Sequence, residues 1–147
     1  MTQQVQPKRI LVATDFSRGA EAALSWAKAL AAAFRAEVIL LHVLDLSRFP
    51  PNIAAAPTGE AMLEHVRADN ARQMAAMVER FPGARPILRE GTARSAILEV
   101  ATEVDADLIV MGTHGHTGLT HVFFGSVAEH VVRHSRIPVL TVRQNSI

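Results

Sequence analysis

The clearest indication of the fold comes from residues 106–118, which read Ala-Asp-Leu-Ile-Val-Met-Gly-Thr-His-Gly-His-Thr-Gly. A run of buried-type apolar residues ends at Met111 and passes into glycines at positions 112 and 115. A Gly125-Ser126 pair then precedes a helical pattern. Glycines after a strand let main-chain N–H groups approach an anion, and a helix start adds the positive end of its dipole. The stretch therefore predicts a phosphate-binding connection between a strand and a helix.

Length and composition indicate one ordinary globular domain. The chain has 147 residues, 49% of them apolar, a net charge of +1 and no cysteine. We expect a single domain over residues 1–147 with an ordered core of about 8–143. The interspersed charges predict no nucleic-acid or membrane partner, and the lack of cysteine excludes disulfides and cysteine catalysis. A polar start without a signal-peptide core predicts a cytoplasmic protein.

Five apolar runs alternate with four segments of helical periodicity. The expected strands are residues 10–14, 37–44, 85–89, 108–111 and 137–143. The expected helices, each with one apolar face, cover residues 20–34, 63–81, 93–104 and 126–134. Residues 46–57 contain three prolines and read as a loop.

This alternation predicts an α/β fold. Strands joined by helices run parallel, and the helices then cover both faces of the sheet, which gives a doubly wound, Rossmann-like arrangement of five strands. Ligands of such sheets bind beyond the carboxyl ends of the strands, where the strand order reverses. Thr14 and Asp15 end the first expected strand, and Met111 and Gly112 end the fourth. These four residues are candidates for a binding site.

Two segments resemble the universal stress protein family in its single-domain form. One is Ile-Leu-Val-Ala-Thr-Asp-Phe-Ser at residues 10–17. The other is the spacing Gly112-x2-Gly115-x9-Gly125-Ser126, followed by Ile-Pro-Val-Leu at residues 137–140. The resemblance covers nearly the whole chain and implies a strand order of 3-2-1-4-5. Because the glycine pattern is intact, it also implies binding of ATP, or of ADP or AMP.

The resemblance further implies roles for individual residues. Asp15 would contact the ribose and adenine, Val43 would offer main-chain groups to adenine, and Gly112 would lie under the ribose. His116 stands where the family often has arginine or lysine. The phosphates would be surrounded by Gly115, Gly125, Ser126 and Val127. The full set of expected nucleotide-binding residues is Thr14, Asp15, Val43, Met111, Gly112, Gly115, His116, Gly125, Ser126 and Val127.

Plain structural interpretations compete with these roles. The glycines could form only a tight strand-to-helix connection. Ser126 begins the sequence Ser-Val-Ala-Glu, a capping box in which its hydroxyl would accept from the Glu129 N–H. Asp15 could cap the first helix or, less simply, accept a phosphoryl group, although no acidic metal cluster adjoins it in the sequence.

The expected metal ion belongs to the nucleotide and not to the protein. No lysine or arginine lies between Gly112 and Ser126, so Mg²⁺ or Mn²⁺ is expected to neutralise the phosphates. His114, His116 and His121 could chelate a metal, but no carboxylate lies in their loop, and we predict no protein-only metal site. The motif also lacks a strong general base and an arginine finger, so we predict no catalytic residue and at most slow hydrolysis.

The last expected strand predicts self-association. Pro138 cannot donate a ladder hydrogen bond, which favours an edge position, and exposed apolar edges are commonly paired. Pairing of two copies along residues 137–143 would give a homodimer, as the resemblance also implies; the chain's own termini could cover the edge instead. The leading interpretation is a homodimeric, ATP-binding stress-response regulator whose protein partners are unknown. The alternatives are a slow ATPase or autophosphorylating enzyme, and an interaction module with a vestigial nucleotide site.

Overall fold

A computed structural model describes residues 3–114 and 124–144 of the chain. The strands are β1 (Arg9–Ala13), β2 (Glu37–Asp45), β3 (Arg85–Gly91), β4 (Leu108–Gly112) and β5 (Val139–Val142). The helices are α1 (Arg18–Phe34), α2 (Gly59–Arg80), α3 (Ala93–Glu103) and α4 (Ser126–His134). The segment expected to be a plain loop contains two short 3₁₀ helices, η1 (Leu46–Arg48) and η2 (Ile53–Ala55).

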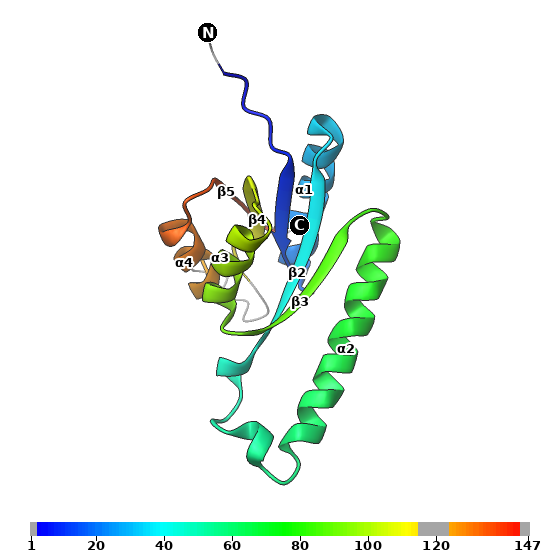
Figure 1. Cartoon of the computed structure of the whole chain (residues 1–147), viewed down its shortest axis with the longest axis vertical. Helices are drawn as coiled ribbons and strands as arrows, with labels where there is room; N and C mark the ends of the chain where they lie inside the picture. The colour runs from blue at the N-terminus through cyan, green and yellow to red at the C-terminus, as the bar shows by residue number, and fades with distance from the viewer. Residues whose placement is uncertain (1–2, 115–123, 145–147) are drawn as a thin grey trace.

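All strand pairs are parallel, and the sheet has the order β3-β2-β1-β4-β5 (Figure 1). The predicted fold class and strand order are confirmed. Leu11 in β1 aligns with Ile39 of β2 on one side and with Ile109 of β4 on the other. The strand order therefore reverses at β1, and the carboxyl ends of β1 and β4 flank the point of reversal.

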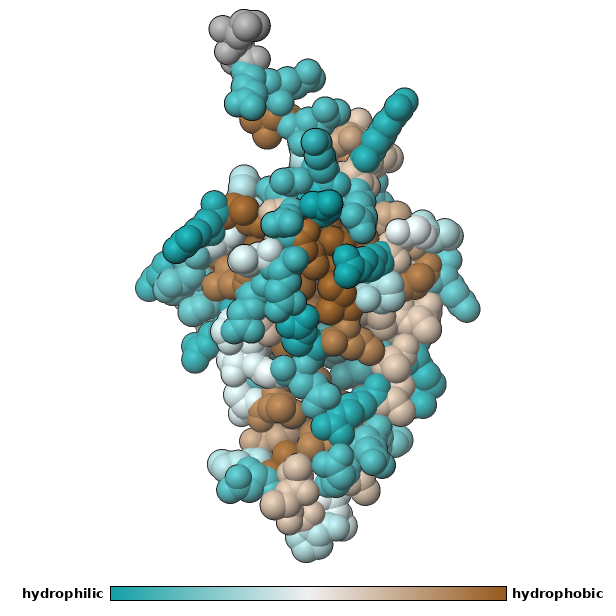
Figure 2. Space-filling view, viewed as in Figure 1, coloured by the Kyte–Doolittle hydropathy of each residue, from teal (hydrophilic) through white to brown (hydrophobic). Residues whose placement is uncertain are grey.

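Helices cover both faces of the sheet because alternate strand residues point to opposite sides. Val12 and Leu40 pack in a cluster with residues of α1 and α2, whereas Leu11 and Ile39 pack with α3 and α4. All four side chains are fully buried, and each such burial contributes roughly 1.5–3 kcal/mol to the stability of the fold. Figure 2 shows apolar side chains gathered at the centre of the viewed face, over β2 and β3 between α3 and α2.

The start of α1 is capped by a side chain, although by Ser17 and not by Asp15. Ser17 is the N-cap of α1, and its Oγ accepts a hydrogen bond from the Ala20 N–H at 3.2 Å. Beyond α2 the chain turns at Gly83, whose φ of 95° favours glycine. Figure 1 shows α2 continuing past the carboxyl ends of β2 and β3, with the η1–η2 segment beside its first turns.

The boundaries of two strands, β3 and β5, differ from expectation by more than one residue. β3 continues to Gly91, two residues further than predicted. The reason is that β2 extends to Asp45, so that every residue of β3 has a partner on β2. β5 is shorter than predicted and begins after Pro138, whose carbonyl accepts from the Ile109 N–H at 3.0 Å. β5 does lie at an edge of the sheet, as expected. Within the described part of the chain, no helix has the length and apolar character needed to cross a membrane.

Candidate functional site

A cavity of about 470 Å³ opens at the carboxyl ends of β1 and β4. Its walls come from β1, β2, β4, η1, α2 and the N-terminal parts of α1, α3 and α4. Every expected nucleotide-binding residue that the structure describes lines it: Thr14, Asp15, Val43, Met111, Gly112, Gly125, Ser126 and Val127. The other two expected residues, Gly115 and His116, lie outside the described residues. The sequence therefore located the cavity from residues distant in the chain.

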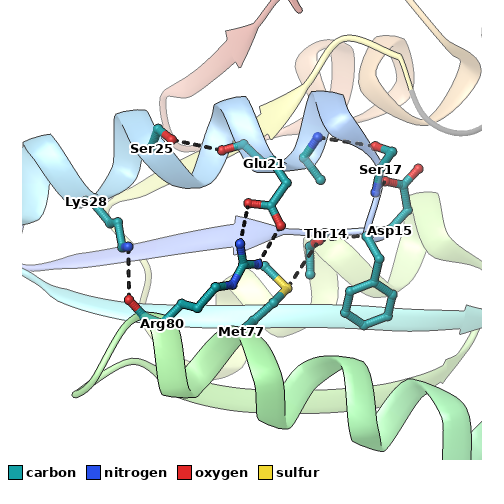
Figure 3. A network of polar contacts seen from close by, with 10 residues as sticks. Thr14, Asp15, Ser17, Glu21, Ser25, Lys28, Met77 and Arg80 are labelled. Carbon is teal, nitrogen blue, oxygen red and sulfur yellow. Dashed lines mark hydrogen bonds and ion pairs between the residues drawn. The ribbon is translucent and has the colours of Figure 1, made fainter.

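The end of β1 is a tight turn held by its own side chains (Figure 3). The Thr14 N–H continues the ladder to the Leu41 carbonyl at 2.8 Å, and Thr14 Oγ1 accepts from the Phe16 N–H at 3.0 Å. Asp15 Oδ1 accepts from the Ser17 N–H at 3.0 Å. Phe16 has a φ of 65°, an uncommon conformation for a bulky residue, so these bonds stabilise a strained turn. Asp15 therefore braces the start of α1 while also lining the cavity.

Val43 lies on β2 beyond the point where its neighbour β1 ends. The Leu41 carbonyl points toward β1, and residues two apart on a strand present their main-chain groups to the same side. Beyond Leu41, β1 has ended, and the Thr14 carbonyl is bonded to Nδ1 of the His42 ring at 2.8 Å. The N–H and C=O of Val43 are therefore directed into the cavity and not into a β1 ladder. His42 and Phe16, whose rings lie 4.4 Å apart, form a further part of its wall.

The end of β4 requires glycine for packing. A Cβ built on Gly112 would lie 2.9 Å from the Gly19 carbonyl carbon and 3.0 Å from its oxygen. Such contacts are with backbone and cannot be relieved by a side-chain rotation. Gly112 therefore allows the start of α1 to approach β4 closely, and Gly19, which the sequence analysis did not single out, is the other half of this contact.

The start of α4 corrects one interpretation of Ser126. Gly125 is the N-cap of α4, and Ser126 is the first helical residue. The Glu129 N–H donates to the Gly125 carbonyl at 3.0 Å, and the Glu129 carboxylate pairs with Arg133 at 2.8 Å. The capping-box interpretation is therefore wrong, because the helix begins one residue earlier than that motif requires.

The first turn of α4 faces the cavity with donors. The N–H groups of its first three residues have no acceptor within the helix, and all three residues line the cavity: Ser126, Val127 and Ala128. The Gly125 N–H is fixed by the Thr113 carbonyl at 2.7 Å. This end of the cavity therefore has the properties of an anion site, with the positive end of a helix dipole behind it. We call residues 14–15, 112–113 and 125–127 the strand-end wall.

The opposite side of the cavity is built from side chains that the sequence analysis missed. We call this side the helix wall: Arg48, Phe49, Val66, Asn70 and Gln73. On α2, the last three recur at spacings of four and three and continue the apolar stripe that ends in the buried Met74 and Met77. The sequence did contain a signal for this wall: the carboxamides of Asn70 and Gln73 occupy positions where the stripe would otherwise be apolar. Arg48 adds a cation that the glycine loop itself lacks.

Asp45 connects the segment that contains the two 3₁₀ helices to the start of α3. Its carboxylate accepts from the Ser47 N–H at 3.0 Å, from the Ser47 hydroxyl and from the Ala93 N–H at 3.1 Å. Partial burial alone would raise the pKa of Asp45, but these hydrogen bonds and the nearby Arg48 charge hold that pKa below its ordinary value. The ionised carboxylate therefore ties η1 to the start of α3 beside the cavity.

Within residues 3–114 and 124–144, no three His, Cys, Asp or Glu side chains gather in a group that could hold a metal ion. His116 and His121, considered above as metal ligands, lie outside the described residues. The ionisable side chains on the cavity are spread around it: Asp15, His42, Asp45, Arg48 and His114. His114 Nδ1 lies 3.1 Å from the Thr113 hydroxyl. The lining of the cavity thus combines the N-terminus of α4, which attracts anions, the carboxylates of Asp15 and Asp45, and two amides on α2.

The fold and cavity define a doubly wound α/β protein with its candidate site at the point where the strand order reverses. The model of the universal stress protein family matches residues 7–143, and the chain belongs to this family. Universal stress protein MJ0577 of Methanocaldococcus jannaschii is 31% identical, covering 97% of this chain and 98% of the relative. A universal stress protein of Thermus aquaticus is 36% identical, covering 92% of this chain and 98% of the relative.

Solved structures agree with this assignment. The structure of MJ0577 superposes with a TM-score of 0.84 at 33% identity, covering 97% of this chain and all of that one. UspA from Lactobacillus plantarum gives a TM-score of 0.82 at 27% identity, with 95% of this chain and 100% of that one covered. A universal stress protein in complex with cAMP gives 0.61 at 30% identity, with 94% and 98% covered.

Proposed function

We propose that this protein binds ATP, or ADP or AMP, in the cavity at the carboxyl ends of β1 and β4. The observation that carries the proposal is that eight residues from four separate segments of the chain line one cavity. The cAMP complex of a structural neighbour supports the choice of an adenine nucleotide. The family membership supports a role in the stress response.

The chemistry of the walls suggests how the nucleotide would lie. Donors at the start of α4 suit the phosphates, since a helix N-terminus attracts anions. The Asp15 carboxylate suits ribose hydroxyls, which are donors. The main-chain groups of Val43 present one donor and one acceptor, which suit the edge of adenine. Gly115 and His116, which lie outside the described residues, are proposed as further phosphate-binding residues because of their places in the glycine motif.

A divalent cation, Mg²⁺ or Mn²⁺, would be held mainly by phosphate oxygens and water. This assignment fits the donor set, because hard cations take oxygen ligands and commonly keep several waters. On the strand-end wall, the Ser126 and Thr113 hydroxyls are the neutral oxygens available to such a shell. The cation would balance phosphate charge that backbone dipoles balance poorly.

We further propose that the protein acts in the cytoplasm as a homodimeric regulator whose partners read its nucleotide state. The edge position of β5 supports the dimer, because a free strand edge is a template for pairing. Val139, Leu140 and Thr141 are only half-buried in the single chain. Two copies related by a two-fold axis would bury these side chains and pair the edge strands.

The test is to identify what the purified protein carries. Freshly purified protein would be denatured, and the released small molecules separated by chromatography against adenine nucleotide standards. We expect ATP, ADP or AMP in amounts that approach one per chain, and a thermal shift when ATP and Mg²⁺ are added to stripped protein. Protein without nucleotide and without a shift would contradict the proposal.

A further inference from the structure

We propose that two carboxamides on α2, Asn70 and Gln73, read the edge of the base and make the cavity select a 6-aminopurine. The inference rests on the proposed nucleotide function and goes beyond it, because neither residue belongs to the glycine motif or to the ends of β1 and β4. Both side chains are half-buried and line the cavity from the helix wall.

The level of α2 along the sheet places these amides beside the end of β2. The Thr14 hydroxyl donates to Met77 Sδ at 3.9 Å, so Met77 marks the level at which β1 ends (Figure 3). Gln73 and Asn70 precede Met77 by four and seven residues, which is about 6 and 10 Å of helix rise. Strands rise about 3.3 Å per residue, so the two amides lie roughly level with residues 43–45 of β2. This is the stretch that presents the main-chain groups of Val43.

Ion pairs hold α2 on both sides of the amides. Toward its start, Arg67 contacts Glu90 of β3 with both Nε and Nη2, at 3.0 and 2.9 Å, and also reaches Glu60. Toward its end, Arg80 contacts Glu21 of α1 at 2.6 Å (Figure 3). These exposed pairs add little stability individually, but bidentate geometry fixes the rotation of the helix. The face that carries the amides is therefore set relative to the sheet.

The Gln73 carboxamide has a defined orientation. Its Nε2 donates to Asp69 Oδ2 at 3.0 Å, one helical turn earlier, so its amino group is engaged and its Oε1 is left as an acceptor. The Asn70 carboxamide has no hydrogen-bond partner within residues 3–114 and 124–144. The helix wall thus offers one fixed acceptor and one amide that can present either of its ends.

This pattern favours a 6-amino group over a 6-oxo group. An adenine amino group is a donor and satisfies an amide oxygen, while carboxamides pair naturally with the N6 and N7 atoms of adenine. A 6-oxo group would place two acceptors against each other. A site that expects a hydrogen bond rejects an analogue that leaves the polar group unpaired.

The experiment measures dissociation constants by calorimetry for three Mg²⁺-bound ligands: ATP, ITP, which carries a 6-oxo group, and purine riboside triphosphate, which carries hydrogen there. Gln73→Met and Asn70→Ala remove the amides. Asp69→Ala keeps Gln73 but frees its carboxamide to turn. Glu79→Ala, exposed on the same helix, is the matched control.

We expect Gln73→Met and Asn70→Ala each to weaken ATP binding by about five- to tenfold and to leave the 6-hydrogen analogue unchanged, because only ATP has the contacted group. Asp69→Ala should mainly reduce the preference for ATP over ITP, and Glu79→Ala should alter nothing. Equal losses for ATP and the 6-hydrogen analogue would overturn the inference, as would unchanged ATP binding in both amide variants. A wild-type protein that binds none of the three ligands would instead overturn the proposed function, and the inference with it.

Discussion

The strand-end wall and the helix wall enclose the same cavity but are built by different means. The strand-end wall uses backbone: its glycines allow close packing, and its N–H groups come from the first turn of α4. The helix wall uses side chains on η1 and α2, which reach the cavity only because α2 continues past the sheet (Figure 1). A backbone wall tolerates few substitutions, whereas a side-chain wall can change its specificity without losing the fold.

The largest effect should come from the backbone contact beneath the strand-end wall. Gly112→Ala should destabilise the fold by about 2–3 kcal/mol, because its Cβ would lie 2.9 Å from the backbone of Gly19. Gly125→Ala should cost less than about 1 kcal/mol, since its Cβ would meet the Thr113 oxygen at 3.3 Å. Urea denaturation of both variants measures the difference. Equal stabilities would show that this wall does not depend on the close approach.

The next effect concerns the edge at β5, outside both walls. The carbonyls of Pro138 and Val142 point toward β4, so by alternation the Thr141 N–H points to the free edge. Thr141→Pro removes that donor without touching the β4 ladder and should convert a dimer to a monomer. Light scattering coupled to gel filtration measures the mass. Leu140→Pro is the control that breaks the ladder itself, and a Thr141→Pro protein that remains dimeric would exclude pairing through this edge.

A smaller effect separates ligand contact from helix capping within the strand-end wall. Ser126→Ala should weaken ATP binding by about tenfold through loss of one charge-assisted hydrogen bond. Its stability to urea should stay unchanged, because Gly125 and not Ser126 is the N-cap of α4. Ser25→Ala, whose hydroxyl bonds only its own helix at Glu21, is the control. A loss of stability with unchanged affinity would restore a structural role for Ser126.

The smallest effect tests the anchoring of η1 beside the helix wall. Asp45 has a pKa below its ordinary value in the fold, so its ionised form stabilises the protein above the unfolded pKa of about 4. That stabilisation is lost as the pH falls through the lower, folded pKa. Asp45→Asn should cost less than about 1 kcal/mol at pH 7, since the carboxylate is partly exposed and screened, and nothing near pH 2.

Urea midpoints of wild-type and Asp45→Asn protein, compared from pH 7 to pH 2, measure this difference. Glu79→Gln on the exposed face of α2 controls for the loss of a surface charge. A difference that grows toward low pH would have the wrong sign and would contradict the assigned hydrogen bonds.

The two walls also differ in how far the sequence could predict them. The parallel α/β class and the strand-end wall followed from local signals: apolar runs, the helix between each pair of strands, and glycines where strands end. The strand order followed from the family resemblance. The helix wall depended on how α2 lies against the sheet, which involves contacts between residues distant in the sequence, such as Arg67 with Glu90, 23 residues apart. Asn70 and Gln73 interrupt an apolar stripe, and that interruption was the only local trace of their position.

The failure of the capping-box alternative for Ser126 has a similar cause. Ser-Val-Ala-Glu is a good capping box in isolation, but the Gly125 N–H is held by Thr113 at the end of β4. Gly125 is thereby the N-cap, and Ser126 is the first residue of the helix. Local sequence predicted the range of the helix correctly, whereas the capping-box alternative failed because the deciding contact comes from the end of β4.

The most direct test of the central claim is calorimetric titration of ATP with Mg²⁺ into nucleotide-free wild-type protein and into Gly125→Val. Valine is compatible with the extended backbone at this position, where φ is −71°, and it adds a branched side chain to a residue that lines the cavity. Its Cβ would lie 3.3 Å from the Thr113 oxygen. We predict one ATP per chain for the wild type and at least about tenfold weaker binding for Gly125→Val, with α-helical content unchanged. Absence of binding to the wild type, or equal affinity in the folded variant, would contradict a nucleotide site at the strand-end wall.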